Sequence, residues 1–388
     1  MKKVVQIKLK KNREQSVLRH HPWIFSGGIA AFEGNPENGS RVSVQNCLGE
    51  VIAHGHYFDG SIAVRILSFD KDCDIPTSIS IKMAKAFELR KSLDLVDNPK
   101  TNIYRLIHGE GDQLSGLIID VYGKTFVIQC HTIGIYRELE HIVKSLIDLY
   151  GPEINIFDKS ADLIDGANPK SYLHGSYYEE NWVENGYKFQ IDWDKGQKTG
   201  FFIDQRNNRA LVAKYAKDKM VANLFSYSGG FSVYAQGAGA KEVISVDASA
   251  AANELARKNF NLNFDINHEV ITADAIDYIR NLSNRFDVIV LDPPAFAKHL
   301  SAKHKASQAY KRINSQAIKH IRPGGILFTF SCSQVIDSNY FKDIITAASI
   351  EVGRNVRILH QLSQPEDHPI NIFHPESNYL KGLVLFVE

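Results

Sequence analysis

From about residue 192 to the C-terminus, short apolar runs rich in β-branched residues alternate with stretches of helical periodicity. This alternation predicts βαβ units, in which a mostly parallel, doubly wound sheet is covered by helices on both faces. Ligands of such sheets bind beyond the carboxyl ends of the strands, so the residues that follow each run are the candidate site. The expected strands are 220–225, 243–246, 270–272, 286–291, 326–330 and 383–387.

Two further domains are expected before this segment. Residues 1–73 contain short alternating runs separated by Gly and Asn, which predicts a small β-rich barrel or sandwich. After Pro76, a helical pattern covers about Ile79 to Leu95. Asn185-Gly186 stands between two alternating runs and predicts a type I′ hairpin turn. We therefore expect an α/β chain with a β-rich domain over 1–73, an α+β middle domain over 74–191 and a Rossmann-like domain over 192–388.

The composition narrows the class of protein. The 388 residues contain no apolar run of the ~18 residues that a membrane span needs. Residues 1–9 are basic and alternate, which predicts a strand and lacks the apolar centre of a signal peptide. The four cysteines, Cys47, Cys73, Cys130 and Cys332, are scattered without CxxC spacing. This argues against disulfides and against a zinc site, so we expect a cytoplasmic protein without a metal.

The loop after the first strand of the C-terminal domain has the composition of a cofactor loop. Its small residues let a ligand approach the backbone closely at the start of a helix. The spacing is not GxGxxG, so the dinucleotide fingerprint is absent. The candidate contacts in this loop are Phe225, Ser226, Tyr227, Ser228 and Gly229.

Carboxylates follow the next two expected strands. Asp247, next to Ala248, can accept both hydroxyls of a ribose, although it can also cap the helix that begins near Ser249. Asp274 can accept from an adenine amino group, with Ala275 as a backbone donor. An adenosine ligand without a pyrophosphate fits this set, and S-adenosylmethionine is such a ligand.

Two segments are strongly basic. Residues 1–20 carry seven Lys or Arg and one acid, and the segment between Pro293 and Ile336 carries seven and no acid. Charge runs are often solvated faces, but an acid-free basic segment beside a candidate site favours a polyanion. We therefore expect RNA as the partner.

The fourth and fifth strands are followed by residues suited to base chemistry. Asp292, Pro293 and Pro294 come directly after 286–291, and Cys332 ends the next run. This Asp-Pro-Pro loop resembles the catalytic loop of base-modifying methyltransferases. A cysteine in an apolar strand is usually a small buried hydrophobe, but the position of Cys332 beside this loop favours a nucleophile.

Further strings extend the resemblance to nearly the whole chain. Residues 20–28 resemble the start of a PUA domain, a small RNA-binding pseudobarrel, although Trp23 and Phe25 also suit a core. The chain as a whole resembles the PUA-containing class I methyltransferases that modify cytosine C5 in bacterial large-subunit ribosomal RNA. The strings that carry this resemblance are 105–112, 200–209, 224–232, 292–296 and 331–333, while 113–116 depart from the family's usual Gly and Pro in what is expected to be a turn.

The resemblance implies an S-adenosylmethionine-dependent rRNA (cytosine-C5) methyltransferase with Cys332 as the nucleophile that adds to cytosine C6. Asp292, also expected among the cofactor contacts, would donate a hydrogen bond or proton at N3. The carbonyls of Pro293 and Pro294 would accept from the cytosine amino group. Phe296 is expected either to stack on a flipped base or to pack in the core. Lys298 is expected to contact the substrate RNA, and both Lys298 and the basic segment 303–312 are candidate cations beside the thiol.

Two other functions fit part of the sequence. Methylation of guanine N7 would use a similar Asp-Pro-Pro loop but needs no thiol, so Cys332 distinguishes the two reactions. A non-catalytic RNA-binding or ribosome-assembly protein would not need the three carboxylates. The expected partners are 23S ribosomal RNA, or a large-subunit assembly intermediate, and a second copy of the chain in a homodimer; no membrane partner is expected.

Overall fold

The structure is a computed structural model that describes residues 5–282, 284–297 and 299–388. Its internal contacts divide the chain into two compact units. The first unit comprises Met1–Val183, Ile191–Ile203 and Glu366–Ser377, and the second comprises Glu184–Gln190, Asp204–Pro365 and Asn378–Glu388. Two segments from the C-terminal half of the sequence therefore pack with the N-terminal half. No helix of the described ranges combines the length and the apolar composition that a membrane crossing requires.

The N-terminal part of the first unit is a sheet with the strand order β2-β6-β5-β4-β1-β3, which confirms the expected β-rich fold. Strand β1 pairs with β4 in parallel and with β3 in antiparallel orientation. Alternate side chains of these strands, such as Val42 and Val44, are buried in one core because successive residues of a strand face opposite sides. The elements are β1 (Val5–Leu9), α1 (Gln15–Leu18), β2 (Trp23–Phe25), β3 (Ile29–Glu33), β4 (Arg41–Gln45), β5 (Val51–Tyr57) and β6 (Ile62–Ser68).

The rest of the first unit is α+β, as expected, with a sheet of order β11-β10-β9-β8-β7. Helix α2 begins at Ile75, earlier than the predicted Ile79. The reason is local: the Asp74 carboxylate accepts from the backbone N–H of Thr77 at 2.8 Å, and Pro76 suits the first helical turn. The elements are α2 (Ile75–Ser92), β7 (Ile103–His108), β8 (Leu117–Tyr122), β9 (Thr125–Cys130), α3 (Ile133–Tyr136), α4 (Leu139–Tyr150), β10 (Asn155–Asp158) and β11 (Ser171–His174).

A short hairpin, β12 (Trp182–Glu184) and β13 (Tyr187–Phe189), follows in the chain. Its turn residues have positive φ, 51° at Asn185 and 87° at Gly186, which confirms the predicted type I′ turn.

The second unit contains the predicted mostly parallel sheet, with the order β16-β15-β14-β17-β18-β20-β19. Strand β20 is antiparallel to both of its neighbours. The prediction missed β19, because this strand is largely exposed and its apolar pattern is weak. The elements are α5 (Arg206–Ala216), β14 (Met220–Leu224), α6 (Gly230–Gly237), β15 (Glu242–Asp247), α7 (Ala250–Asn261), β16 (Glu269–Thr272), α8 (Ala275–Arg280), β17 (Val288–Leu291), α9 (Lys303–His320), β18 (Gly325–Ser331), α10 (Ser338–Val352), β19 (Val356–Leu362) and β20 (Lys381–Val387).

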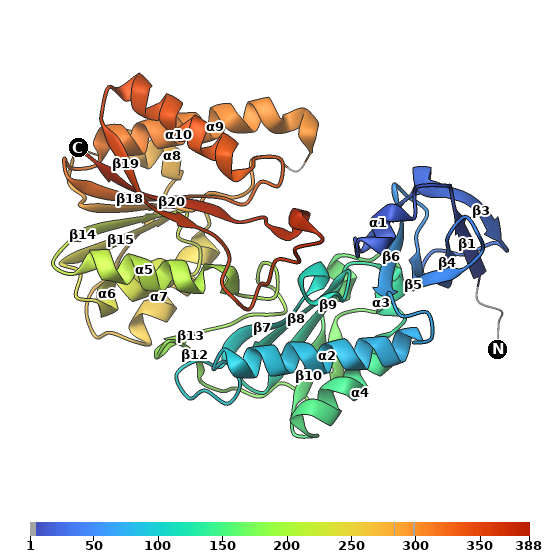
Figure 1. Ribbon diagram of the computed structural model, residues 1–388. Coiled ribbons are helices and arrows are strands. Elements are labelled where there is room, and N and C mark those ends of the chain that lie inside the picture. Colours follow the sequence, from blue (N-terminus) through green and yellow to red (C-terminus); the bar gives the residue numbers. More distant parts are fainter. Residues whose placement is uncertain (1–4, 283, 298) are drawn as a thin grey trace. The chain divides into compact units, whose positions relative to one another are not determined.

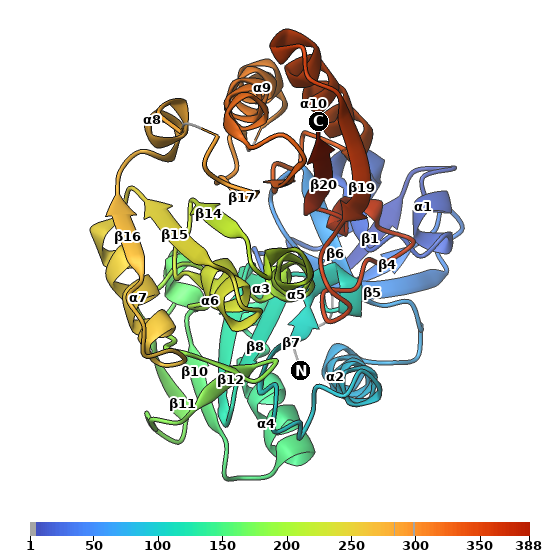
Figure 2. The same ribbon diagram turned by 90° about the vertical axis from the view of Figure 1, so that its left-hand side faces the viewer.

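Helices cover both faces of this sheet. Figures 1 and 2 show α5, α6 and α7 on one face and α8, α9 and α10 on the other. Along β17, Val288 and Val290 belong to the core on the first face, while Ile289 and Leu291 belong to the core on the second. A strand buried on both faces in this way reads as a continuous apolar run, which is why the sequence revealed it.

Candidate active site

The predicted site residues follow the carboxyl ends of parallel strands. Leu224 of β14 is in register with Val246 of β15 and with Leu291 of β17, and Leu291 is in register with Thr329 of β18. The loops that begin after these residues therefore leave the sheet at the same edge. The strand order reverses direction between β14 and β17, which is where ligands bind in sheets of this type.

The loop after β14 has an unusual backbone. Phe225 and Tyr227 are not glycines, yet their φ angles are 60° and 43°. Conformations of this kind concentrate at functional sites, because the surrounding structure must hold them in place. The backbone N–H of Ser226 donates to the carbonyl of Val246 at 3.0 Å, which ties the loop to the end of β15.

Gly229 allows α6 to start close to α7. Its φ is 74°, and a Cβ at this position would lie 3.0 Å from the Cβ of Ala256. Ser228 and Gly229 are buried, and the Asn259 side-chain amide donates to the carbonyl of Ser228 at 2.8 Å. The loop is therefore a fixed backbone cradle rather than a mobile connection.

The Asp247 carboxylate holds this cradle in place. One oxygen accepts from the backbone N–H of Tyr227 at 2.9 Å, and the other accepts from the N–H of Ser249 at 2.9 Å. The cap of α7 is supplied by Ser249, whose hydroxyl accepts from the N–H of Ala252. Helix capping is thus not the role of Asp247. A carboxylate has about four acceptor sites, so two protein donors leave room for ribose hydroxyls.

Asp274 is exposed and caps α8. Its Oδ1 accepts from the backbone N–H groups of Ile276 and Asp277 at 2.8 and 3.1 Å. Ala275 is the buried first residue of that helix, while Ala248 beside Asp247 is exposed. The capping bonds explain Asp274 structurally, and they leave its Oδ2 for a ligand.

Asn253 is a positioning residue that the sequence did not indicate. Its side-chain amide donates to the carbonyl of Asp247 and to the hydroxyl of Thr272, both at 2.9 Å. It therefore links the ends of β15 and β16. Because an asparagine within a helix is common, no sequence signal singled it out.

The Asp292 side chain lies half-buried after β17. Its Oδ2 accepts from the Gln205 side-chain amide at 2.9 Å, and the Gln205 side-chain oxygen Oε1 accepts from the side-chain amide of Asn208 at 2.6 Å. Gln205 and Asn208 lie in the 200–209 string, for which no role had been assigned. The contact orients the Asp292 carboxylate from the side of α5.

The residues that follow Asp292 differ in their exposure. Pro293 is buried, Pro294 is exposed and Phe296 is half-buried. The Phe296 ring packs on Tyr310 with centroids 4.7 Å apart, which shows that it contributes to the core. Lys298, the predicted cation, lies outside the described residues.

Cys332 is half-buried in the loop after β18. This loop is tied to the Asp292 loop, because the backbone N–H of Ala297 donates to the Ser333 hydroxyl at 3.3 Å. The Ser333 hydroxyl also shares a hydrogen bond of 3.0 Å with the Tyr310 hydroxyl. By contrast, Cys130 is buried, and burial raises the pKa of its thiol to about 12. These surroundings make Cys332 a better nucleophile candidate than Cys130.

Lys381, the first residue of β20, lies next to Cys332 and was missed by the sequence analysis. Its amine donates to the carbonyls of Ser333 and Tyr379 at 2.8 and 2.7 Å. Burial lowers the pKa of Lys381 to about 8, while negative charge at Cys332 and Asp337 opposes this shift. A cation in this place favours the thiolate form of Cys332.

The acid-free basic segment includes all of α9, and its Lys and Arg side chains differ in whether they already have a partner. Lys311 makes an ion pair of 2.6 Å with Glu351, and Arg322 makes one of 2.7 Å with Asp287. Lys303 lies over the Tyr340 ring at 4.5 Å. Within α9 the exposed cations are Lys305, Arg312 and Lys319.

Comparisons with known proteins agree with this geometry. Residues 167–381 match a family of S-adenosylmethionine-dependent methyltransferases, and residues 7–69 match a PUA-like domain. The chain is 40% identical over 393 residues to the "Ribosomal RNA large subunit methyltransferase I" of Aeromonas salmonicida, with 98% of this chain and 99% of that protein covered.

Solved structures have the same fold. A Streptococcus mutans protein described as a SAM-dependent methyltransferase has a TM-score of 0.83 at 22% identity, with 98% of this chain and 99% of that chain covered. A methyltransferase complexed with SAH has a TM-score of 0.84 at 22% identity and the same coverage. Together with the matched family, these findings confirm the predicted fold class and the cofactor. The chain belongs to the S-adenosylmethionine-dependent methyltransferase family and begins with a PUA-like domain.

Proposed function

We propose that this chain methylates C5 of a cytosine in large-subunit (23S) ribosomal RNA, with Cys332 as the covalent nucleophile. The observation that carries the proposal is the placement of Cys332. Cys332 is half-buried in the loop after β18, and this loop is hydrogen-bonded to the Asp292 loop. The Lys381 amine donates a hydrogen bond to the backbone carbonyl of Ser333, the residue after Cys332. The name of the 40% identical Aeromonas salmonicida relative supports ribosomal RNA as the substrate.

The proposed reaction requires a thiol because cytosine C5 alone is a weak nucleophile. The Cys332 thiolate forms a bond to C6, and the electron pair of the C5–C6 double bond becomes available at C5. C5 takes the methyl group of S-adenosylmethionine, whose sulfur keeps the electron pair of the broken bond as S-adenosylhomocysteine leaves. A base then removes the C5 proton, and the double bond re-forms as the thiolate departs.

The Asp292 loop is proposed to hold the cytosine. Asp292, in its protonated form, would donate a hydrogen bond or a proton to N3, where negative charge develops, and Gln205 would keep its carboxyl group oriented. Pro294 is exposed, so its carbonyl is available to the cytosine amino group. Phe296 would contact the base only at the ring face that Tyr310 leaves open. Guanine N7 needs no thiol, so methylation there would leave the Cys332–Lys381 arrangement without a function.

The cofactor is proposed to lie on the loop after β14. The backbone of residues 225–229 would contact the methionine part, Asp247 and Ala248 the ribose, and Asp274 and Ala275 the adenine; Asp292 would approach the reacting methyl group. We also propose that the domains are 1–73, 74–191 and 192–388, and that the first of them binds RNA.

Replacing Asp247 with alanine should weaken S-adenosylmethionine binding by about tenfold to a hundredfold, or about 1.4–3 kcal/mol. The substitution removes the ribose acceptor and releases the Tyr227 N–H that shapes the cradle. Isothermal titration calorimetry measures the change. Asp277→Ala is the control, because Asp277 is exposed and pairs only locally with Arg280. Unchanged affinity in a folded Asp247→Ala protein would remove Asp247 from the site.

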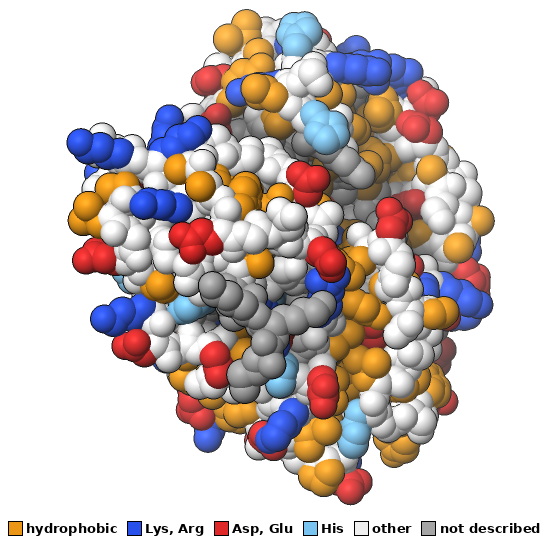
Figure 3. Space-filling model, turned by 90° about the vertical axis from the view of Figure 1, so that its right-hand side faces the viewer, with side chains coloured by type: hydrophobic (Ala, Val, Ile, Leu, Met, Phe, Trp, Pro, Cys, Tyr) orange, Lys and Arg blue, Asp and Glu red, His pale blue; other side chains and the backbone are white. Residues whose placement is uncertain are grey.

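RNA binding should become less salt-dependent when the exposed cations of α9 are neutralised. A Lys305→Gln, Arg312→Gln, Lys319→Gln protein should reduce the slope of log K against log salt by up to about 2, at about 0.7 for each contact with single-stranded RNA. The variant Lys311→Gln is the control, because Lys311 is already paired with Glu351. On the face drawn in Figure 3, cations are interspersed with acids, so we expect the effect to come from α9 rather than from a general field. If the triple variant has the same slope as the wild-type protein, the cations of α9 do not contact RNA and are only solvated surface charges.

The substrate itself is tested by nucleoside mass spectrometry of large-subunit ribosomal RNA incubated with the purified protein and S-adenosylmethionine. The expected product is 5-methylcytidine at one position. Formation of 7-methylguanosine instead would overturn the proposal.

A further inference from the structure

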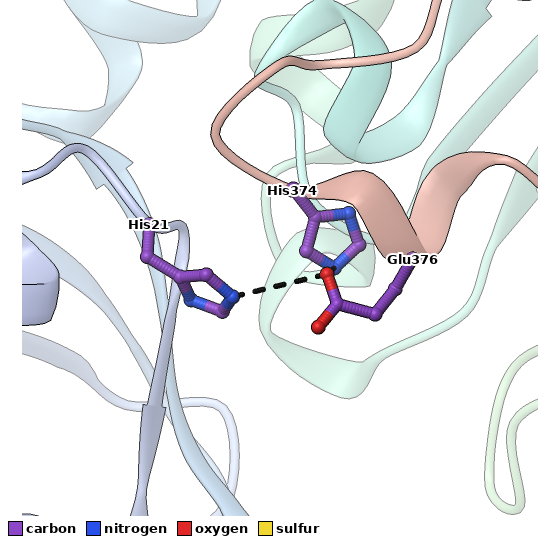
Figure 4. A group of neighbouring side chains, drawn as sticks. All are labelled: His21, His374 and Glu376. Atoms are coloured by element: carbon purple, nitrogen blue, oxygen red, sulfur yellow. Dashed lines mark ion pairs between the residues drawn. The ribbon is translucent and has the colours of Figure 1, made fainter.

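Three potential metal ligands from distant parts of the sequence meet within the first unit. His21 lies in the loop before β2, and His374 and Glu376 lie in the segment Glu366–Ser377. Figure 4 shows the two imidazole rings and the carboxylate pointing toward one another. The Glu376 Oε2 is 4.0 Å from the Nε2 of His21 and 3.7 Å from the Nε2 of His374, and the candidate ligand atoms all lie within 4.8 Å of one another.

His374 carries a second, independent signal. Its side chain is buried, with 3% exposure, and neither of its ring nitrogens has a hydrogen-bond partner. The distance of 3.7 Å to Glu376 is too long for a hydrogen bond. The Trp23 ring, with its centroid 4.3 Å away, packs against the imidazole and offers no acceptor. Buried nitrogens without partners are rare in folded proteins and call for an unseen ligand.

The Nδ1 of His21 faces the backbone of Trp23, at 3.1 Å from its carbonyl and 3.2 Å from its backbone N–H, which donates to Nδ1 when that nitrogen is unprotonated. Ligation through Nε2 requires the other tautomer, in which Nδ1 carries the proton and donates to the carbonyl, and the lone pair of Nε2 then points toward Glu376. Histidines that bind metals are oriented in this way by a carbonyl or carboxylate behind the ring. The indole N–H of Trp23 donates to the Glu110 carboxylate at 2.9 Å, and this hydrogen bond fixes the position of the indole ring.

We propose that His21, His374 and Glu376 bind a divalent transition-metal ion, with zinc as the preferred ion. Two imidazoles and one carboxylate form a known zinc ligand set, which leaves a fourth position for water. Ligand atoms ~2.0–2.1 Å from a tetrahedral zinc lie about 3.3 Å apart, so atoms 4.8 Å apart must approach by about 1.5 Å. Glu376, whose side chain is 55% exposed, can close its gaps of 4.0 and 3.7 Å, and the His21 ring, whose side chain is 20% exposed, must move toward His374.

The bound ion would cross-link the His21 loop to the segment Glu366–Ser377, and this segment leads within five residues to Lys381.

The test is a zinc titration of the full-length Cys332→Ser protein after treatment with a chelator, so that zinc binding by the proposed nucleophile does not contribute. Calorimetry with a competing chelator should detect one equivalent of zinc with a Kd of about 1 μM or tighter. His374→Ala and Glu376→Gln should each weaken this step by about a hundredfold. Zinc should raise the Tm of the Cys332→Ser protein by at least about 2 °C and should leave unchanged the Tm of the same protein carrying His374→Ala or Glu376→Gln.

His20→Ala is the matched control, because the adjacent His20 stacks on Phe69 and is not among the three ligands. It should retain zinc binding. Glu376→Gln changes an exposed side chain, so it remains informative even if the buried His374→Ala variant does not fold. The absence of a one-equivalent step in the parent protein, or a step that Glu376→Gln leaves unchanged, would overturn the proposal. Neither result bears on methylation, which is measured with Cys332 intact.

Discussion

Replacing Cys332 with alanine should lower methyl transfer by at least about a thousandfold while leaving cofactor and RNA binding intact. In the proposed mechanism the effect is large because the Cys332 thiolate is the group that adds to C6 and makes C5 nucleophilic. The side chain is small and half-buried, so its removal should not disturb the sheet. Single-turnover methylation of large-subunit RNA, alongside binding measurements for both ligands, separates chemistry from affinity.

A covalent trap tests the same prediction directly. RNA with 5-fluorocytosine at the target should remain attached to the wild-type protein, because after methyl transfer C5 carries no proton for a base to remove. The adduct should map to Cys332 by peptide mass spectrometry and should be absent from Cys332→Ala. Cys73→Ala is the control, since Cys73 is also half-buried but lies outside the methyltransferase sheet. Near-normal methylation by Cys332→Ala, or an adduct on another residue, would refute the covalent mechanism.

The sequence was informative wherever local rules decide the structure. The Asn185-Gly186 turn follows from the φ angles that a tight hairpin needs, and β17 follows from burial on both of its faces. The start of α2 was misplaced because Pro76 was taken as a boundary, although proline is favoured within the first turn. Strand β19 was missed because an exposed strand does not need a regular apolar pattern.

The candidate site was predictable only where its residues follow strands. Asp247, Asp292 and Cys332 could be placed together because parallel strands end at the same edge. The residues that orient them could not, because Gln205 and Asn253 act through side-chain contacts across the sheet edge. Periodicity carries no information on such contacts.

Long-range packing also explains the other omissions. Lys381 lies just before the predicted strand 383–387, and a lysine is usually an exposed charge. The candidate ligands His21 and His374 are separated by most of the chain, so their spacing resembled no metal motif. The prediction that no metal is bound rested on cysteine spacing and stays a prediction, which the zinc titration described above tests.

Lys381→Met should reduce methylation at pH 7 by about a hundredfold or more, as expected when a buried charge beside a reacting anion is removed. In the proposed mechanism Lys381 is a positioning residue, which would act by favouring the Cys332 thiolate. Its charge is unfavourable for folding: the pKa falls from 10.5 to about 8 in the folded protein, and at 1.36 kcal/mol per unit the difference is roughly 3 kcal/mol. Because the unfolded chain binds this proton more tightly, the penalty is fully present below about pH 8 and disappears as the pH rises toward 10.5. A lysine kept under such a penalty indicates a functional role.

The dependence of the rate on pH distinguishes this role from a structural one. Without the cation, the Cys332 thiol should ionise only at higher pH. The acid limb of the plot of methylation rate against pH should therefore move to higher pH by at least about one pH unit in Lys381→Met, and raising the pH should restore much of the activity. Lys381→Arg should keep the wild-type limb, because a guanidinium stays charged throughout this range. Lys319→Met, which alters an exposed lysine of α9, should change nothing. A uniform loss at every pH would mean that Lys381 only holds the Ser333 and Tyr379 carbonyls in place, and normal activity in Lys381→Met would remove it from the mechanism.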